Sequence, residues 1–308
     1  MIRSKTSLPA KSLLAWLRLT NRKRTYAELD RFRRSIESSQ AKGDRGPIRA
    51  IRRRFDVTRS EVDGRPCYTI RPAGGGGDGN HVLYFHGGAY VHQIQHDHWR
   101  FFGRLIDRTG CTVTVPIYPL APAHQCPETT AFVRRAYDEF SADVAPEDQI
   151  VMGDSAGAGI ALALTKALRD EGRPVPKETV LLSPWLDLTM THPAQPALDE
   201  RDPYLALTGL NEAARLYSGQ LPRTDPRLSP LSGDLSGLGA LSVYIGTKDV
   251  LLSDARRLHT LCTEQGVPLS YHEYEGMIHA WMLAAIPEAR VALEEIAHLV
   301  DRSLVKPV

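Results

Sequence analysis

A serine stands between two glycines in GDSAG, residues 153–157, directly after the apolar run 150–152 and directly before Ala and Leu residues at helical spacing. This order of strand, sharp turn and helix is the context that a nucleophilic serine requires. Side chains two positions away would crowd such a turn, and the glycines relieve that crowding. The start of the helix also directs the amide of Ala156 at a developing oxyanion. We interpret Ser155 as a candidate nucleophile.

A second chemical element lies upstream, where YFHGGAY, residues 84–90, ends a predicted strand. Small residues in this position let backbone amides approach a substrate carbonyl, which bulky side chains would block. The predicted oxyanion donors are the amides of Gly88, Ala89 and Ala156, and Gly87 shapes the loop and is a further candidate donor. The alternative is a plain Gly-Gly turn between a strand and a helix.

A serine hydroxyl needs a base, and the base needs an orienting carboxylate. Of the eleven histidines, only His279 follows the last predicted strand, where a glycine permits a turn back towards Ser155. Asp249 follows the predicted strand 241–247 and is the expected acid. Asp254 is the rival, although its place at the start of a predicted helix favours a capping or first-turn role.

The other candidate ligands are interpreted as structural. His272 lies in a predicted strand and His259 on a predicted helix face. His92, His96 and His98 raise the question of a metal, but no acidic or cysteine set accompanies them, so neither a metal nor another cofactor is predicted. The four cysteines lack metal-ligand spacing. Reduced thiols in a cytoplasmic protein are the expectation.

The elements that must position these residues alternate along the chain. A hairpin is predicted over 53–72, around an Asp-Gly turn. Further strands are predicted at 81–88, 111–118, 148–153, 179–184, 241–247 and 269–276, and helices at 98–110, 126–140, 156–169, 254–266 and 288–304. Such alternation indicates a largely parallel sheet. The Pro- and Gly-rich region from Trp185 to about Leu238 contains no predicted core strand and is expected to lie over the carboxyl edge of the sheet.

The N-terminal segment is strongly basic, with 17 Lys and Arg against 5 Asp and Glu in residues 1–60. Trp16 and its neighbouring leucines could lie on an anionic membrane surface. We favour a cap helix that buries its apolar stripe on the rest of the protein. That stripe comprises Leu13, Leu14, Leu17, Leu29, Phe32 and Ile36. No nucleic-acid motif accompanies the charge, and no apolar run is long enough for a stable membrane insertion.

Seven motifs together resemble the hormone-sensitive-lipase-like esterases of the α/β-hydrolase superfamily. In order they are HGGAY, YPLAPAHQCP, GDSAGAG, LLSPWLDLT, DPRLSPL, IGTKDVLLSDA and EGMIHAW, from about residue 50 onwards. The resemblance implies an α/β-hydrolase fold with a mostly parallel, eight-stranded sheet flanked by helices. It implies a catalytic domain over 51–308 and a helical cap made by residues 1–50 and the insertion at about 185–238. A homodimer is the assembly that it suggests.

Three departures from the family pattern bear on these expectations. Ala89 stands where a third glycine is usual, which keeps the amide but narrows the space beside the acyl carbon. Pro119 and Ala123 replace an Arg and a Glu. KDVLL replaces the familiar DPL, so the assignment of Asp249 rests on its position in the chain.

The expected activity is hydrolysis of short or medium acyl esters, with lactones, deacetylation and amide hydrolysis as variants of the same acyl-enzyme chemistry. One alternative is a non-catalytic small-molecule-binding protein on a hydrolase scaffold, although such proteins usually lack a working base. Another is a protein whose basic arm acts at a membrane surface. The candidate substrate-pocket residues, for which simple packing is the alternative, are Tyr90, Trp185, Tyr204, Leu205 and Tyr217.

Overall fold

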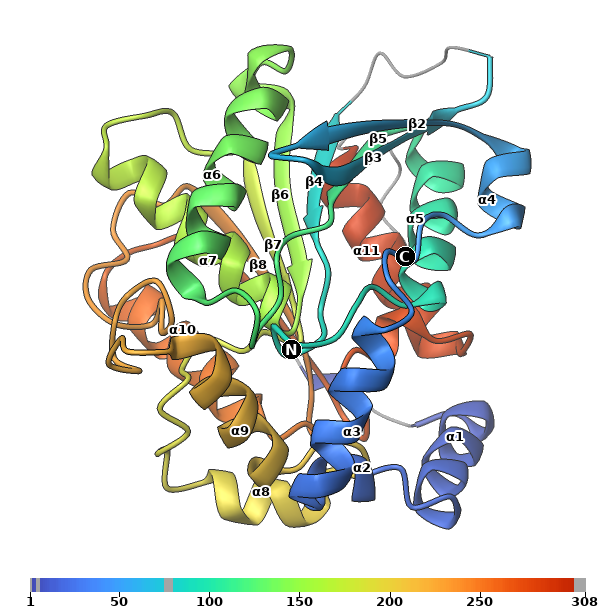
Figure 1. Ribbon diagram of the computed structural model, residues 1–308, viewed down its shortest axis with the longest axis vertical. Coiled ribbons are helices and arrows are strands. Elements are labelled where there is room, and N and C mark those ends of the chain that lie inside the picture. Colours follow the sequence, from blue (N-terminus) through green and yellow to red (C-terminus); the bar gives the residue numbers. More distant parts are fainter. Residues whose placement is uncertain (1, 4–5, 75–79, 302–308) are drawn as a thin grey trace.

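A single sheet of nine strands, in the order β1-β9-β8-β7-β6-β4-β5-β3-β2, runs through the molecule (Figure 1). The computed structural model describes residues 2–3, 6–74 and 80–301. The strands are β1 Ile2–Arg3, β2 Phe55–Val62, β3 Arg65–Pro72, β4 His81–Phe85, β5 Thr112–Pro116, β6 Gln149–Asp154, β7 Glu178–Leu182, β8 Ala240–Gly246 and β9 Leu269–Tyr274. The eight predicted strands are therefore confirmed as β2 to β9. The two-residue β1, which we did not predict, pairs in parallel with the end of β9.

Only the β2–β3 and β3–β5 pairs are antiparallel among the described strands, so the sheet is mostly parallel as predicted. Asp63 and Gly64 both have positive φ, 48° and 71°, and form the hairpin turn between β2 and β3. Such a two-residue turn matches the right-handed twist of the strands that it joins.

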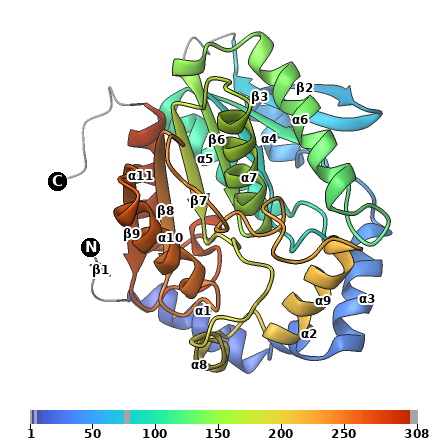
Figure 2. The ribbon, with the colours of Figure 1, turned by 90° about the vertical axis from the view of Figure 1, so that its left-hand side faces the viewer.

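Helices cover both faces of the sheet. α5 and α11 lie on one face and α6, α7 and α10 on the other (Figures 1 and 2). The α-helices are α1 Leu8–Leu19, α2 Arg24–Ala27, α3 Leu29–Gln40, α4 Arg49–Arg54, α5 His96–Thr109, α6 Cys126–Ala142, α7 Ala156–Asp170, α8 Gln195–Arg201, α9 Leu207–Ser218, α10 Leu252–Glu264 and α11 Pro287–Val300, with short 3₁₀ turns at Pro146–Asp148 and Trp281–Leu283. Within the described ranges, every helix falls short of the length and apolar character that a bilayer span requires.

The register of the central strands brings their carboxyl ends level. Phe85 of β4 lies opposite Gly153 of β6, and Asp154 lies opposite Leu182 of β7. Because parallel strands end at the same edge, the loops that follow β4, β6 and β7 meet there. This edge is where ligands bind in open α/β sheets.

Two segments far apart in the sequence lie side by side over this edge. α2 and α3 pack against α9 (Figure 1). Arg33 of α3 forms an ion pair with the buried Glu212 of α9 at 2.9 Å, and Lys23 pairs with Asp199 of α8 at 3.1 Å. These contacts join residues of the N-terminal segment to residues of the 185–238 insertion.

The predicted apolar stripe of the N-terminal segment is mostly buried. Leu14, Leu17, Phe32 and Ile36 are buried and Leu13 packs against the core. Leu29 is an exception, because it begins α3 and remains 37% exposed.

Candidate active site

Ser155 lies at the turn between β6 and α7 with φ 53° and ψ −120°, a conformation that is strained for a residue with a side chain. The two flanking glycines are required by close backbone contacts. A Cβ at Gly153 would collide with the backbone of Gly157, and a Cβ at Gly157 would collide with the carbonyl of Phe85. The turn is held by the amide of Ser155, which donates to Leu182 O at 2.8 Å. Ser155 is therefore presented at the carboxyl edge of the sheet.

His279 and Asp249 form a buried pair, with Nδ1 of the histidine 2.8 Å from Oδ2 of the carboxylate. Burial by itself would lower the pKa of His279, but the charge and the hydrogen bond of Asp249 raise it above its usual value of 6.5 overall. His279 lines the same cavity as Ser155. The imidazole is thus oriented by a carboxylate on one side and faces the serine's cavity on the other.

Asp202 is a second buried carboxylate at this position, and we did not predict it. Its Oδ2 accepts from the amide of Val250 at 3.0 Å, and its Oδ1 accepts from the amides of Tyr204 and Leu205. Burial and then the charge of Asp249 raise the pKa of Asp202 to about 7. In the sequence Asp202 is an ordinary Asp-Pro turn, and no spacing indicates that it meets the loop of Asp249.

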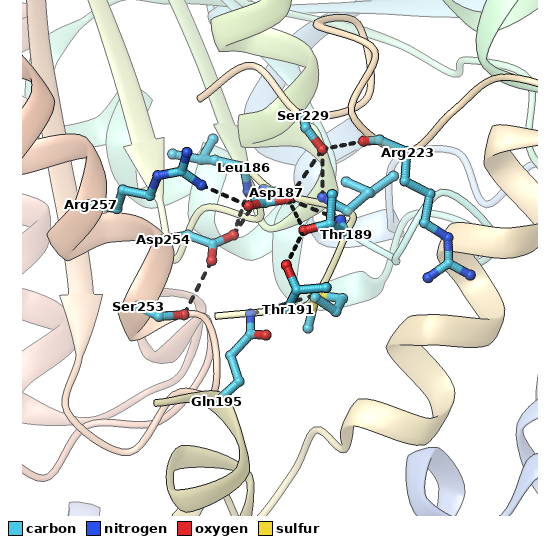
Figure 3. A network of polar contacts seen from close by, with 12 residues as sticks. Leu186, Asp187, Thr189, Thr191, Gln195, Arg223, Ser229, Ser253, Asp254 and Arg257 are labelled. Carbon is cyan, nitrogen blue, oxygen red and sulfur yellow. Dashed lines mark hydrogen bonds and ion pairs between the residues drawn. The ribbon is translucent and has the colours of Figure 1, made fainter. Parts of the chain in front are cut away.

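Asp254, the rival acid, lies in the first turn of α10 and has a different partner. Its Oδ2 accepts from the amides of Leu186 and Asp187 at 2.9 and 3.0 Å (Figure 3). Burial, and to a smaller extent the charge of Asp187, raise its pKa to about 7. Asp249 accepts the hydrogen bond from Nδ1–H of His279. Asp254 instead supports the loop that follows β7.

That loop is held by further polar contacts (Figure 3). Asp187 accepts from the amide of Thr189 at 2.9 Å and forms an ion pair with Arg257 at 2.9 Å. The hydroxyl of Ser229 accepts from the amide of Leu188 at 2.8 Å. The start of the same loop is tied to the active site, since the amide of Trp185 donates to Ser155 O at 3.1 Å.

The predicted oxyanion loop, which follows β4, has an unusual backbone. Gly88, Ala89 and Tyr90 have φ of 134°, 53° and 62°. Within the described part of the chain, the amides of Gly88, Ala89 and Ala156 have no hydrogen-bond acceptor. Three of the four predicted donors are therefore free to bind an oxyanion.

Gly87 requires a correction. Its amide donates to Oδ1 of Asp154 at 2.8 Å and is not available to a substrate. The same buried carboxylate accepts from the hydroxyl of Tyr84 at 2.8 Å and lies 3.1 Å from Nε2 of His98. Gly87 therefore anchors the loop, and a Cβ there would collide with the Asp154 side chain.

His98 has a defined role in this network. Its Nδ1 accepts from the amide of Gln95 at 3.0 Å, so Nε2 carries the proton that faces Asp154. Burial alone would raise the pKa of Asp154, but the interaction with His98 lowers it overall. In the sequence His98 stands out only as a member of a histidine cluster.

Among the described residues, no group of three or more His, Cys, Asp or Glu side chains is placed to hold a metal ion.

A cavity of about 370 Å³ contains Ser155 and His279. Its apolar wall comes from the N-terminal segment, the 185–238 insertion and the segment that follows β9. Its lining includes Leu13, Leu17, Tyr26, Tyr204, Leu205, Leu210, Ile278, Leu283 and Ala284. Its polar side includes Ser35, His92, Gln95 and Asp97. No Lys or Arg lines it among the described residues. The lining by α1 and α2 was not predicted, because sequence periodicity identifies a buried face and not what that face covers.

Two of the five predicted pocket residues, Tyr204 and Leu205, line this cavity. The other three do not, and their expected role is corrected. Tyr90 stacks on Tyr217 with ring centroids 3.9 Å apart and lies 5.6 Å from the ring of Trp185. All three are buried, so their rings support the loops around Ser155 by packing.

A larger cavity of about 530 Å³ lies away from these residues. It is bordered by β3, β5 and α6 and includes Arg71, His81 and Glu139. It does contain a hydroxyl beside a histidine, because Thr114 Oγ1 lies 2.7 Å from Nε2 of His81. Among the described residues, however, no carboxylate orients that imidazole by a hydrogen bond or an ion pair, and Thr114 lies within β5 and not at a sharp turn. The smaller cavity is therefore the candidate active site.

Comparisons with known proteins agree with this geometry. Residues 82–283 match the family described as alpha/beta hydrolase fold. An acetyl-hydrolase of Streptomyces hygroscopicus is 35% identical over 73% of this chain and 76% of its own, and an esterase of Acinetobacter venetianus is 33% identical over 70% and 73%. The crystal structure of a hormone-sensitive lipase from a metagenome library superposes with a TM-score of 0.83 at 26% identity, covering 97% and 99% of the two chains.

Proposed function

Because the chain belongs to the α/β-hydrolase family, we propose that it hydrolyses carboxylic esters through an acyl-enzyme on Ser155. The observation that carries the proposal is the buried pair of His279 and Asp249, 2.8 Å apart, at the cavity that also contains Ser155. A base held by a carboxylate beside a strained serine is the arrangement that serine hydrolases use on several unrelated folds.

The mechanism follows from these positions. Ser155 Oγ attacks the ester carbonyl carbon while His279 takes the hydroxyl proton, and Asp249 stabilises the resulting imidazolium. The carbonyl oxygen becomes an oxyanion and accepts from the amides of Gly88, Ala89 and Ala156. When the tetrahedral intermediate collapses, the C–O bond to the alcohol breaks and His279 gives its proton to that oxygen. Water then attacks the acyl-enzyme by the same steps and releases the acid.

The proposed substrates are neutral esters of short to medium acyl chains, and a lactone presents the same carbonyl. A cavity of about 370 Å³ is at the lower end of ordinary ligand sites. Its apolar wall suits an acyl chain, and no Lys or Arg among the described residues lines it to pair with an anionic substrate. The methyl group of Ala89 narrows the space beside the oxyanion.

The N-terminal helices and the insertion are proposed to form one cap, with the catalytic domain starting near residue 51. The ion pairs of Arg33 with Glu212 and of Lys23 with Asp199 support this division. Leu17 and Leu205, one from each segment, line the same cavity. The cap is therefore proposed to select substrates, while the sheet edge performs the reaction.

A cytoplasmic location and a homodimer complete the proposal. Four buried cysteines, all free, suit a reducing compartment. The homodimer rests on the family resemblance, in which pairing uses sheet edges. Sedimentation velocity over a range of protein concentrations would test it, and a single species of monomer mass would contradict it.

The experiment that tests the proposed function compares the wild type with Ser155→Ala on p-nitrophenyl esters from acetate to long acyl chains. We expect turnover that is greatest for a short or medium chain and is abolished in the variant. Covalent labelling of the wild type, but not of the variant, by a fluorophosphonate would identify Ser155 as the nucleophile. Equal and negligible rates for both proteins on every ester would favour a binding protein without catalysis.

A further inference from the structure

Helix α1 has two different apolar faces. The inner face buries Ala10, Leu14 and Leu17 against the core. The outer face carries Leu8, Trp16 and Leu19, which are 78%, 46% and 86% exposed. These outer positions are separated by eight and three residues, which places them on one side of a helix. The inner stripe, which we predicted, is therefore buried, and the outer stripe of Leu8, Trp16 and Leu19 remains in contact with solvent.

This clustering is unusual for the molecule. Among the described residues only six large apolar side chains are exposed, and three of them lie on the twelve residues of α1. Single exposed apolar side chains are ordinary on soluble proteins, whereas several of them gathered on one side of one short helix indicate an interaction surface. Figures 1 and 2 show α1 at the rim of the molecule, and the exposure of Leu8, Trp16 and Leu19 shows that this stripe is open to solvent.

Three basic residues on α1 and in the turn after it are unpaired. Lys11, Arg18 and Arg22 have no carboxylate within ion-pair distance in the described part of the chain, whereas Lys23, Arg24, Arg31 and Arg33 all have one. The guanidinium of Arg22 lies 4.7 Å from the ring centre of Trp16. The apolar stripe is thus flanked by cations whose charge is not neutralised within the protein.

We propose that the outer face of α1 docks onto an anionic phospholipid bilayer. Leu8, Trp16 and Leu19 would enter the interfacial region, and Lys11, Arg18 and Arg22 would contact the headgroup phosphates. This is the composition of an interfacial helix, with Trp and Leu beside Lys and Arg. A protein partner would leave these unpaired cations in need of matching acids, whereas an anionic bilayer presents negative charge along its whole surface.

The other side of the helix connects this surface to the candidate active site. Leu13 and Leu17 line the cavity that contains Ser155. Docking through α1 therefore places one wall of the cavity at the membrane, where apolar esters accumulate. This last step rests on the proposed ester hydrolysis, but docking itself does not, and Ser155→Ala is expected to bind vesicles as the wild type does.

The test uses the full chain and sedimented vesicles of phosphatidylcholine alone or mixed equally with phosphatidylglycerol. We expect binding to the anionic vesicles, weaker binding at high salt, and little binding to phosphatidylcholine. Tryptophan fluorescence gives a second readout, because Trp99, Trp185 and Trp281 are buried and Trp16 is exposed. Vesicles should therefore shift the emission of Trp16 to shorter wavelength.

Two pairs of variants separate the apolar and the charged contributions. Leu8→Ser/Trp16→Ser/Leu19→Ser should abolish binding, whereas Leu29→Ser/Val291→Ser, at exposed apolar positions outside α1, should not. Lys11→Glu/Arg18→Glu should weaken binding at least about tenfold. Arg49→Glu/Arg53→Glu changes the net charge equally on α4, at the far end of the molecule (Figure 1), and should have a much smaller effect.

The proposal is overturned if the wild type does not bind anionic vesicles, or if the α1 variants bind as well as their controls. It is also overturned if α1 mediates self-association, seen as a dimer that the triple serine variant loses while vesicle binding is absent. Equal unfolding temperatures of each variant and its control would show that the helix still packs on the core, which the exposed positions of these side chains lead us to expect.

Discussion

The carboxylate of Asp154 accepts a hydrogen bond of 2.8 Å from the amide of Gly87. The residue that precedes the candidate nucleophile thereby holds the loop that carries two of the free amides. The two halves of the site, one after β4 and one after β6, are joined through this contact. Tyr84 and His98 also contact this carboxylate, so three separate groups hold it in place.

Asp154→Asn should lower kcat more than it raises KM. An asparagine oxygen can accept from Gly87, but its NH₂ group would then face the Nε2–H of His98. The loop should shift, and losing one oxyanion donor typically costs about 10² to 10³ in turnover. Steady-state kinetics on a p-nitrophenyl ester would measure this. Tyr84→Phe, which removes one neutral contact to the same carboxylate, is the control and should cost less than about tenfold.

Asp249→Asn should abolish most of the activity while leaving the fold intact. The amide would favour the tautomer of His279 that cannot accept the Ser155 proton, and the corresponding change in a serine protease lowers kcat by roughly 10⁴. Asp254→Asn alters a carboxylate of similar burial that does not contact His279, and serves as the matched comparison. Equal losses of kcat in the two variants would contradict the assignment of the acid.

The pH dependence of kcat/KM should report His279. The base must be neutral to accept a proton, and Asp249 raises its pKa above 6.5. Activity should therefore be lost as the pH falls, with a midpoint above 6.5. The measurement is kcat/KM of the wild type as a function of pH, with the spontaneous hydrolysis of the ester subtracted at each pH. A midpoint well below 6.5 would mean that the charge of Asp249 does not dominate over burial.

Asp254→Asn should change how stability depends on pH. The folded protein raises the pKa of Asp254 from 3.8 to about 7, so between these values it retains a proton that the unfolded chain has lost. The free energy of unfolding of the wild type should therefore fall as the pH rises through that window, by about 1.4 kcal/mol for each pH unit. Asparagine can still accept from Leu186 and Asp187. Urea unfolding should show a smaller decrease with pH in the variant, and parallel curves would contradict this.

Leu205→Ala should shift the preferred acyl chain to a longer one. Leu205 lines the cavity and is buried, so the deletion enlarges the space available to the substrate. A loss of about 2–5 kcal/mol in the free energy of unfolding is also expected. Leu231→Ala, a buried leucine outside the cavity lining, should cost similar stability without changing the chain-length profile. The same ester series measures both profiles.

The sequence predicted the elements well because their signals are local. Apolar runs between turn residues located β4 to β9, and Gly110 ends α5 with φ 69° as a helix-ending glycine does. The order of Ser155, Asp249 and His279 along the chain was sufficient to place all three at one edge of the sheet. Once the strands were known to be parallel, the edge where their loops meet was also known.

The remaining features depend on contacts between distant residues. Asp202 reaches the loop of Asp249 only when the insertion folds over the sheet, and His98 meets Asp154 only when the first turn of α5 lies at the end of β6. Similarly, Tyr90 and Tyr217 stack on each other instead of facing the substrate. None of these pairs has a characteristic spacing, since side-chain contacts between segments far apart leave no periodic pattern in the sequence.

The packing of α1 on α11 also has a consequence for synthesis of the protein. These are the first and the last described helices, so nearly the whole described chain must emerge from the ribosome before α1 and α11 can pack together. At roughly 5–20 residues per second this takes on the order of tens of seconds. During that time both apolar stripes of α1 are uncovered, and transiently exposed apolar surface of this kind is prone to aggregation.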